Sequence, residues 1–143
     1  MKSQEEAVYR EIQRNAENAI KAIEIMWDKV YDADLSMQMS RQSLKYAQLK
    51  GQAMQALLDG SAEPYRGNYL ADMKLRAGMQ YNTLLNTSTG HVAELMIKER
   101  NQGMLELEKV LKHNAEAGEK PRALAEEFME FQQKSIKILK DYL

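Results

Sequence analysis

Apolar residues recur at intervals of three and four positions along most of the chain, the spacing of one face of an α-helix. The first stripe comprises Val8, Ile12, Ala16, Ala19, Ile23, Met26 and Val30. The pattern breaks at 59–67, where Gly60, Pro64 and Gly67 cluster, and again near Gly118. Long helices are therefore predicted over about 3–32, 35–58, 89–116 and 121–142, with one or two short helices within 68–86.

Capping residues stand at the predicted helix ends. They are Ser3 with Glu6 as a capping box, Asp32 or Asp34, Thr87 or Ser88, and Gly118 followed by Pro121. The short link "YDADLS" makes the first two helices antiparallel neighbours. The connection that holds 68–86 is long enough to cross the full length of a bundle. We predict one all-α domain over 1–143, a four-helix bundle with a long crossover between helices two and three.

Composition narrows the classes of function. Apolar residues make up 44% of the chain and charged residues 29%, with a net charge of −1 and no cysteine. The absence of cysteine excludes disulfides, thiolate metal sites and a cysteine nucleophile. No segment carries the cationic face that binds phosphate, so nucleic acid is not an expected partner. The N-terminus has no apolar signal region and no stretch reaches membrane-spanning length, which favours a cytoplasmic protein.

Motifs for catalysis are missing from the sequence. It contains no G-x-S-x-G turn and no glycine-rich phosphate loop. We therefore expect a non-enzymatic protein without a cofactor.

The helix layout resembles the ferritin-like fold, in which two long helices are joined to two more by a long crossover. In metal-binding members of that class, two helices each provide a Glu and the other two each provide Glu-x-x-His. The predicted second helix has no Asp, Glu or His between Leu35 and Leu58, and carries Arg41, Lys45 and Lys50 instead. A di-metal site is therefore not expected in this chain.

Three stretches are also similar to a group of small bacterial helical proteins of uncharacterised activity. They are "AENAIKAIE", "NTLLNTSTGHVAELMI" and "FQQKSIKILKDYL". This resemblance implies a helical fold and a bacterial origin, and it implies no activity.

One pair of residues has metal-ligand spacing. His91 and Glu94 lie one helical turn apart, and Glu24 on the first helix could join them around a single ion. We favour an ordinary first helical turn, in which Glu94 complements the helix dipole and pairs with Lys98.

The third long helix has a polar middle, "KERNQG". Its apolar stripe places Glu99 and Gly103 inward or at the stripe's edge. One interpretation is a polar pocket with close backbone approach at Gly103. The favoured one is a glycine that admits a bulky neighbour such as Trp27 or Tyr46. A buried Glu99 would require an arginine or tyrosine partner.

The segment 68–86 is amphipathic and has three interpretations. The first is a helix packed on the bundle's own side or end. The second is a dimerisation or partner-binding element. The third is a membrane-surface helix, which is weakly supported because Lys74 and Arg76 are its only cations. Its candidate partner-binding residues are Tyr69, Leu70, Met73, Tyr81 and Leu84.

Taken alone, the sequence favours a helical bundle that acts through protein–protein interaction, including self-association to an oligomer. The alternative is a ferritin-like metal-binding or oxidative-stress protein with a degenerate metal site.

Overall fold

The computed structural model describes all 143 residues and contains five helices and no strand. The helices are α1 (Ser3–Trp27), α2 (Ala33–Asp59), α3 (Tyr69–Asn82), α4 (Thr89–His113) and α5 (Glu119–Lys140). They account for 79% of the chain, which confirms the predicted all-α class. The segment 68–86 holds one short helix, α3.

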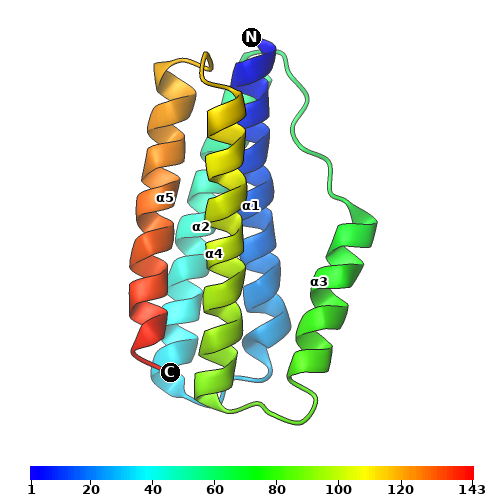
Figure 1. The fold of residues 1–143 in the computed structure, drawn as a ribbon, viewed down its shortest axis with the longest axis vertical. Coiled ribbons are helices and arrows are strands. Elements are labelled where there is room, and N and C mark those ends of the chain that lie inside the picture. Colours follow the sequence, from blue (N-terminus) through cyan, green and yellow to red (C-terminus); the bar gives the residue numbers. More distant parts are fainter.

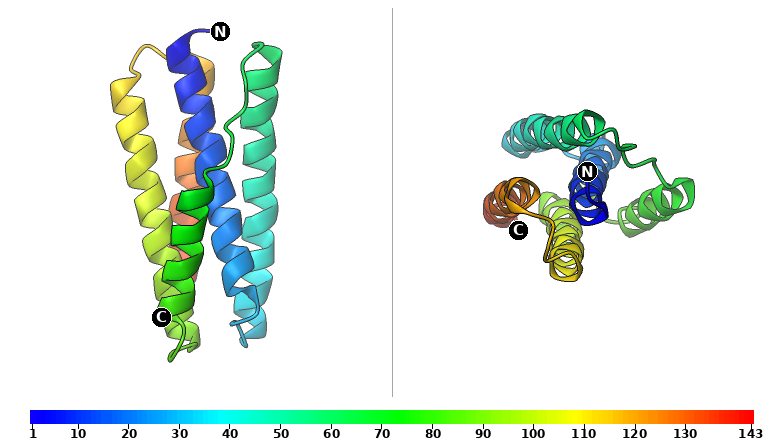
Figure 2. Two further views of the ribbon diagram at one scale, coloured as in Figure 1. Left: turned by 90° about the vertical axis from the view of Figure 1, so that its right-hand side faces the viewer. Right: turned by 90° about the horizontal axis from the view of Figure 1, so that it is seen from above.

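The four long helices lie side by side (Figure 1). In chain order α1 is antiparallel to α2, and α4 is antiparallel to α5. Helix α1 packs against both α2 and α4, and α2 also contacts α5. Helix α3 lies outside this group and packs on α1, as the view from above shows (Figure 2).

Side-chain caps explain where two of the long helices begin. The Asp32 carboxylate accepts a hydrogen bond from the Leu35 amide at 2.9 Å, which starts α2. Ser88 Oγ caps α4 in the same way, accepting from the His91 amide at 3.3 Å. Each cap satisfies a backbone N–H that has no partner within its helix.

The predicted start of the first helix at Ser3 is confirmed, but its predicted capping box and its predicted end were wrong. Helix α1 begins at Ser3 with Lys2 at the N-cap and no side-chain cap, so the capping box with Glu6 does not form. Glu6 pairs with Arg10 at 3.1 Å instead. Helix α1 also ends at Trp27, not near residue 32, because the chain needs residues 28–32 to turn into α2.

The other long-helix limits differ by a few residues. Helix α4 ends at His113, three residues before its predicted end, and the chain turns over 114–117. Gly118 follows with a φ of 97° and serves as the N-cap of α5, so α5 starts before Pro121. A positive φ is a conformation that glycine adopts without steric cost.

The core is aliphatic and rich in methionine. Met26, Met39 and Met96 are fully buried among Leu, Ile and Ala side chains, and Phe128 is the one fully buried phenylalanine. The inward stripes of the four long helices build this core, as the sequence periodicity indicated.

Loss of the α2 cap provides a test of this local account. Asp32→Ala is expected to lower the free energy of unfolding by about 1 kcal/mol, because the Leu35 amide loses its acceptor. Asp32→Asn keeps an acceptor oxygen and is expected to remain near wild type. Urea unfolding followed by circular dichroism measures both. Equal losses in the two variants would contradict the capping role.

Candidate functional site

The middle of the apolar core is polar. Each long helix places a buried polar side chain on its inward stripe near mid-length: Asn15 on α1, Gln42 on α2, Arg100 on α4, and Gln132 and Ser135 on α5. All five are 2% exposed or less. We call these residues the central polar layer. Burial of so many polar groups is tolerable only when they bond to one another.

Arg100 is the cation of this layer and is fully buried. Its Nε donates to Ser135 Oγ at 2.9 Å and its Nη2 donates to Gln42 Oε1 at 3.2 Å. Its Nη1 donates to Glu99 Oε2 at 2.5 Å, forming an ion pair. The guanidinium also lies 5.1 Å from the ring centre of Tyr46, a cation–π distance. Arg100 is therefore bonded to side chains of three different elements.

The layer continues from α2 across to α1. The Tyr46 hydroxyl donates to Gln132 Oε1, and Gln132 Nε2 donates to Asn15 Oδ1 at 3.5 Å. Asn15 Nδ2 then donates to the backbone carbonyl of Gly103 at 2.8 Å. A Cβ on Gly103 would collide with Asn15 Oδ1 and would lie 3.2 Å from Gln132 Nε2. Gly103 thus lets α4 approach α1 closely enough for this bond.

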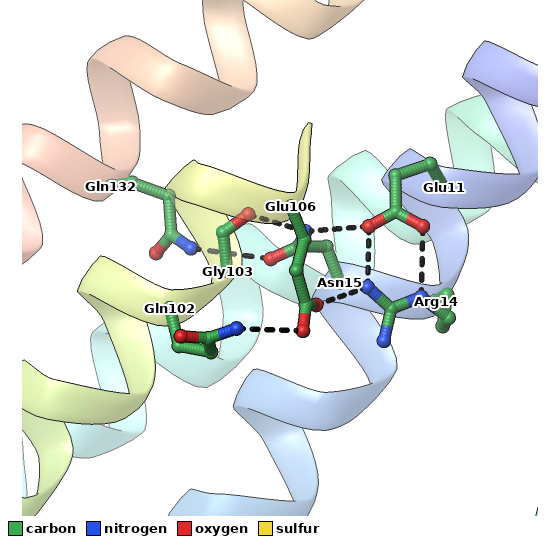
Figure 3. A network of polar contacts seen from close by, with 7 residues as sticks. All are labelled: Glu11, Arg14, Asn15, Gln102, Gly103, Glu106 and Gln132. Carbon is green, nitrogen blue, oxygen red and sulfur yellow. Dashed lines mark hydrogen bonds and ion pairs between the residues drawn. The ribbon is translucent and has the colours of Figure 1, made fainter. Parts of the chain in front are cut away.

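An ion-pair cluster closes the layer at its α1–α4 edge (Figure 3). Arg14 donates to both oxygens of Glu11 and to Glu106 Oε2, and Gln102 Nε2 donates to Glu106 Oε1 at 3.1 Å. Arg14 therefore bridges two carboxylates from two helices. This geometry stabilises the charged forms of Arg14 and Glu106.

The pKa values of Glu99, Glu106 and Tyr46 are shifted by burial, hydrogen bonds and neighbouring charges. Burial raises the pKa of Glu99, and the neighbouring charge of Arg100 opposes that rise. Burial also acts to raise the pKa of Glu106, but hydrogen bonds from Arg14 and Gln102 outweigh it, so this pKa is lowered. Burial raises the pKa of Tyr46 to about 12, against the opposing charge of Arg100. Tyr46 thus stays a neutral donor at physiological pH.

A cavity of about 490 Å³ opens between α1, α3 and α4, directly beside the polar layer. Its polar lining includes Asn15, Asn18, Glu99 and Glu106, and Glu99 retains 11% side-chain exposure. Leu75 and Met79 of α3 and Leu95 of α4 supply apolar lining. The size lies within the range of small-molecule sites.

Glu99 and Gly103 thus belong to a polar pocket, and the favoured interpretation of a bulky neighbour at Gly103 was wrong. The atoms nearest its missing Cβ belong to Asn15 and Gln132, not to Trp27 or Tyr46. Asn15 fits this gap because its Nδ2 donates to the buried Gly103 carbonyl while the side chain fills the space. The expected arginine partner of Glu99 is confirmed as Arg100.

The metal candidates are not brought together. Glu24 is exposed beside a shallow groove between α1 and α2. His91 Nε2 lies 2.7 Å from the Asn82 carbonyl, and its Nδ1 lies 3.7 Å from Glu94. Glu94 pairs with Lys98 at 3.1 Å as expected, and that hydrogen bond lowers the pKa of Glu94. Nowhere does the chain place three or more His, Asp or Glu side chains for a metal ion.

Helix α3 packs on the side of α1, which agrees with the first interpretation of the segment 68–86. Only Met79 of α3 is buried. The exposed apolar side chains of α3 and of the turn that follows it are Tyr69, Leu70, Met73, Tyr81, Leu84 and Leu85, and we call them together the outer α3 face. These side chains are 51–97% exposed, a range that includes all five partner-binding candidates. None of the five helices combines the length and apolarity that a membrane crossing requires.

Arg100 and the buried amides were missed from the sequence. Their signal was present, because Met96, Arg100, Gly103 and Leu107 follow one stripe at spacings of four, three and four. Charged and amide residues at such positions are normally read as the edge of the stripe, because burying them is costly.

Comparison with known proteins adds no family assignment: no protein-family model, curated protein or solved structure matches this chain.

Gly103 offers a test of the close approach between α1 and α4. Gly103→Ala is expected to destabilise the fold by about 1–3 kcal/mol, because the new methyl group displaces Asn15. Gly51 is a matched control, since it lies within α2 and nothing lies within 4 Å of its added Cβ. Gly51→Ala should raise stability by up to about 1 kcal/mol through helix propensity. Chemical denaturation measures both, and stabilisation by both substitutions would refute the packing account.

Arg100 tests the energetics of the layer. Arg100→Met is expected to cost about 3–5 kcal/mol of unfolding free energy, because it leaves the mostly buried Glu99 carboxylate without its donor. Adding Glu99→Gln should recover part of this loss, since a neutral amide is cheaper to bury than a lone carboxylate. Arg41 is exposed, and Arg41→Met should change stability by less than about 0.5 kcal/mol. A second substitution that deepens the loss would contradict the pairing.

Proposed function

We propose that the protein is a non-enzymatic, ferritin-like four-helix-bundle protein of bacterial origin that acts in the cytoplasm through self-association. The outer α3 face is the surface that joins two copies. The ferritin-like assignment is supported by the arrangement of α1 with α2 and α4 with α5 as antiparallel pairs (Figure 1).

The observation that carries the proposal is the exposure of the outer α3 face. Tyr69 and Tyr81 are 75% and 78% exposed, and Leu70 and Leu84 are 71% and 74% exposed. The two tyrosines alone present about 300 Å², if each side chain contributes roughly 200 Å² when free. Apolar area of this size, gathered along one helix of a folded protein, commonly marks an interaction site.

The charges near this face suit a symmetric contact. Leu70, Met73 and Tyr81 follow helical spacing along its centre, while Lys74 and Arg76 interrupt that run in the sequence. Both cations are exposed and make no ion pair, so they can remain solvated at the rim. Asp72, the acidic residue of α3, is held by Lys21 at 2.5 Å.

A second copy is the partner we favour. An apolar helix face is complementary to itself, and two-fold dimers, in which the same patch meets on both subunits, are the commonest oligomers. Tyrosine, leucine and methionine side chains are suited to the desolvated centre of such an interface.

The test is the oligomeric state of the purified protein by size-exclusion chromatography with light scattering. Wild type is expected to form a dimer, and Leu70→Glu with Leu84→Glu should weaken its association at least tenfold by placing charges at the contact. Leu44 of α2 is 73% exposed and provides a matched control. Leu44→Glu should leave the dimer unchanged.

Two results would count against self-association. The first is a monomeric wild type at every concentration tested. The second is an equal loss of dimer in the Leu44→Glu control.

A further inference from the structure

The cavity between α1, α3 and α4 combines apolar walls with unused polar groups. Leu75 and Met79 line it from α3, and Leu95 lines it from α4. Its volume of about 490 Å³ is that of a pocket for a small organic molecule. It opens on the inner side of α3, so this inference stands apart from the outer α3 face.

Glu99 is the principal unused acceptor in this cavity. Its Oε2 accepts from Arg100 at 2.5 Å, while its Oε1 takes part in no hydrogen bond. The side chain of Glu99 lines the cavity and is mostly buried. Gln42 Nε2 is the one buried side-chain polar atom without a hydrogen-bond partner, so Glu99 Oε1 is accessible and can accept from a ligand N–H.

The other charged groups around the cavity are largely committed. Arg14 is held by Glu11 and Glu106, and Lys98 is held by Glu94. Lys74 of α3 lies exposed among the lining residues and has no ion pair. The interior therefore presents a carboxylate acceptor, and the unpaired cation can stay in solvent.

Asn18 adds a second polar contact. It lines the cavity from α1, is half-buried, and makes no hydrogen bond within the protein. Its amide can accept from an ammonium group or donate to a neighbouring ligand oxygen. Glu99 on α4 and Asn18 on α1 thus offer acceptors from two walls.

We propose that this cavity binds a small organic amine, whose ammonium group donates to Glu99 and Asn18 while its apolar body packs against Leu75, Met79 and Leu95. Helix α3 forms the outer wall of the site. It is joined to the rest of the chain by few polar contacts, among them Lys21 with Asp72 at 2.5 Å and Lys29 with Gln80 at 3.1 Å.

The test uses three indole compounds that share an apolar body and differ in charge: tryptamine, tryptophol and indole-3-propionate. Isothermal titration calorimetry on the full chain should show tryptamine binding at least tenfold more tightly than tryptophol, and indole-3-propionate binding most weakly. Glu99→Gln should remove the preference for tryptamine over tryptophol. Glu108→Gln, at an exposed position of the same helix, should preserve the preference.

A second variant, at a cavity-lining residue of α3, provides a test that does not depend on the folding of Glu99→Gln. Leu75→Trp fills the apolar part and should abolish tryptamine binding, with folding checked by circular dichroism. Equal affinity for all three compounds, tightest binding of indole-3-propionate, absence of binding, or unchanged binding by Leu75→Trp would each overturn the proposal. The dimer can persist in any of these cases, so this failure is distinguishable from failure of the α3 interface.

Discussion

Burial of the Arg100 guanidinium is the constraint on which the rest of the interior depends. A guanidinium removed from water needs an acceptor for its N–H groups and a negative charge nearby. Glu99, Ser135 and Gln42 meet this need from α4, α5 and α2, and Tyr46 covers the guanidinium with its ring. Because these partners come from three helices, Arg100 can be satisfied only when the helices stand at one relative height.

The layer therefore selects the register of the long helices. Aliphatic contacts tolerate a shift of one helical turn, since Leu, Ile and Met fill space without strict direction. The bonds from Asn15 to Gly103 and from Tyr46 to Gln132 do not tolerate it, because a shift would leave buried donors unpaired. Even in the observed register, hydrogen bonding in the layer is incomplete at Gln42. Its Oε1 accepts two hydrogen bonds, while its Nε2 is buried without a partner.

Local pattern made the helices predictable, and long-range contact made the site hard to predict. The stripes and the Asp32 and Ser88 caps depend on residues three or four positions apart, which the sequence displays directly. Whether Arg100 is buried depends on Gln42 and Ser135, which lie 58 and 35 residues away. Glu99 and Gly103 were placed correctly and an arginine partner for Glu99 was expected, but the Asn15 and Gln132 side chains that lie against Gly103 come from other helices and could not be predicted from α4 alone.

Helix α3 also combines features that are predictable from local sequence with surroundings that are not. Its existence and its Asn68 cap are local features, with Asn68 Oδ1 accepting from the Ala71 amide at 3.1 Å. Its two faces have different surroundings, because Met79 and Leu75 turn toward the cavity while Leu70 and Tyr81 face outward. An amphipathic pattern alone does not show whether an apolar helix face packs within its own chain or binds another chain.

The two faces of α3 also link the two proposals physically. A short helix with one buried residue is held weakly, and its backbone can shift at little cost. A second copy packed on the outer α3 face would restrain that motion and, with it, the outer wall of the cavity. Ligand binding in the cavity would restrain the same helix from its inner side. Whichever event came first would bear the entropy cost of ordering α3, so dimerisation and ligand binding would favour one another.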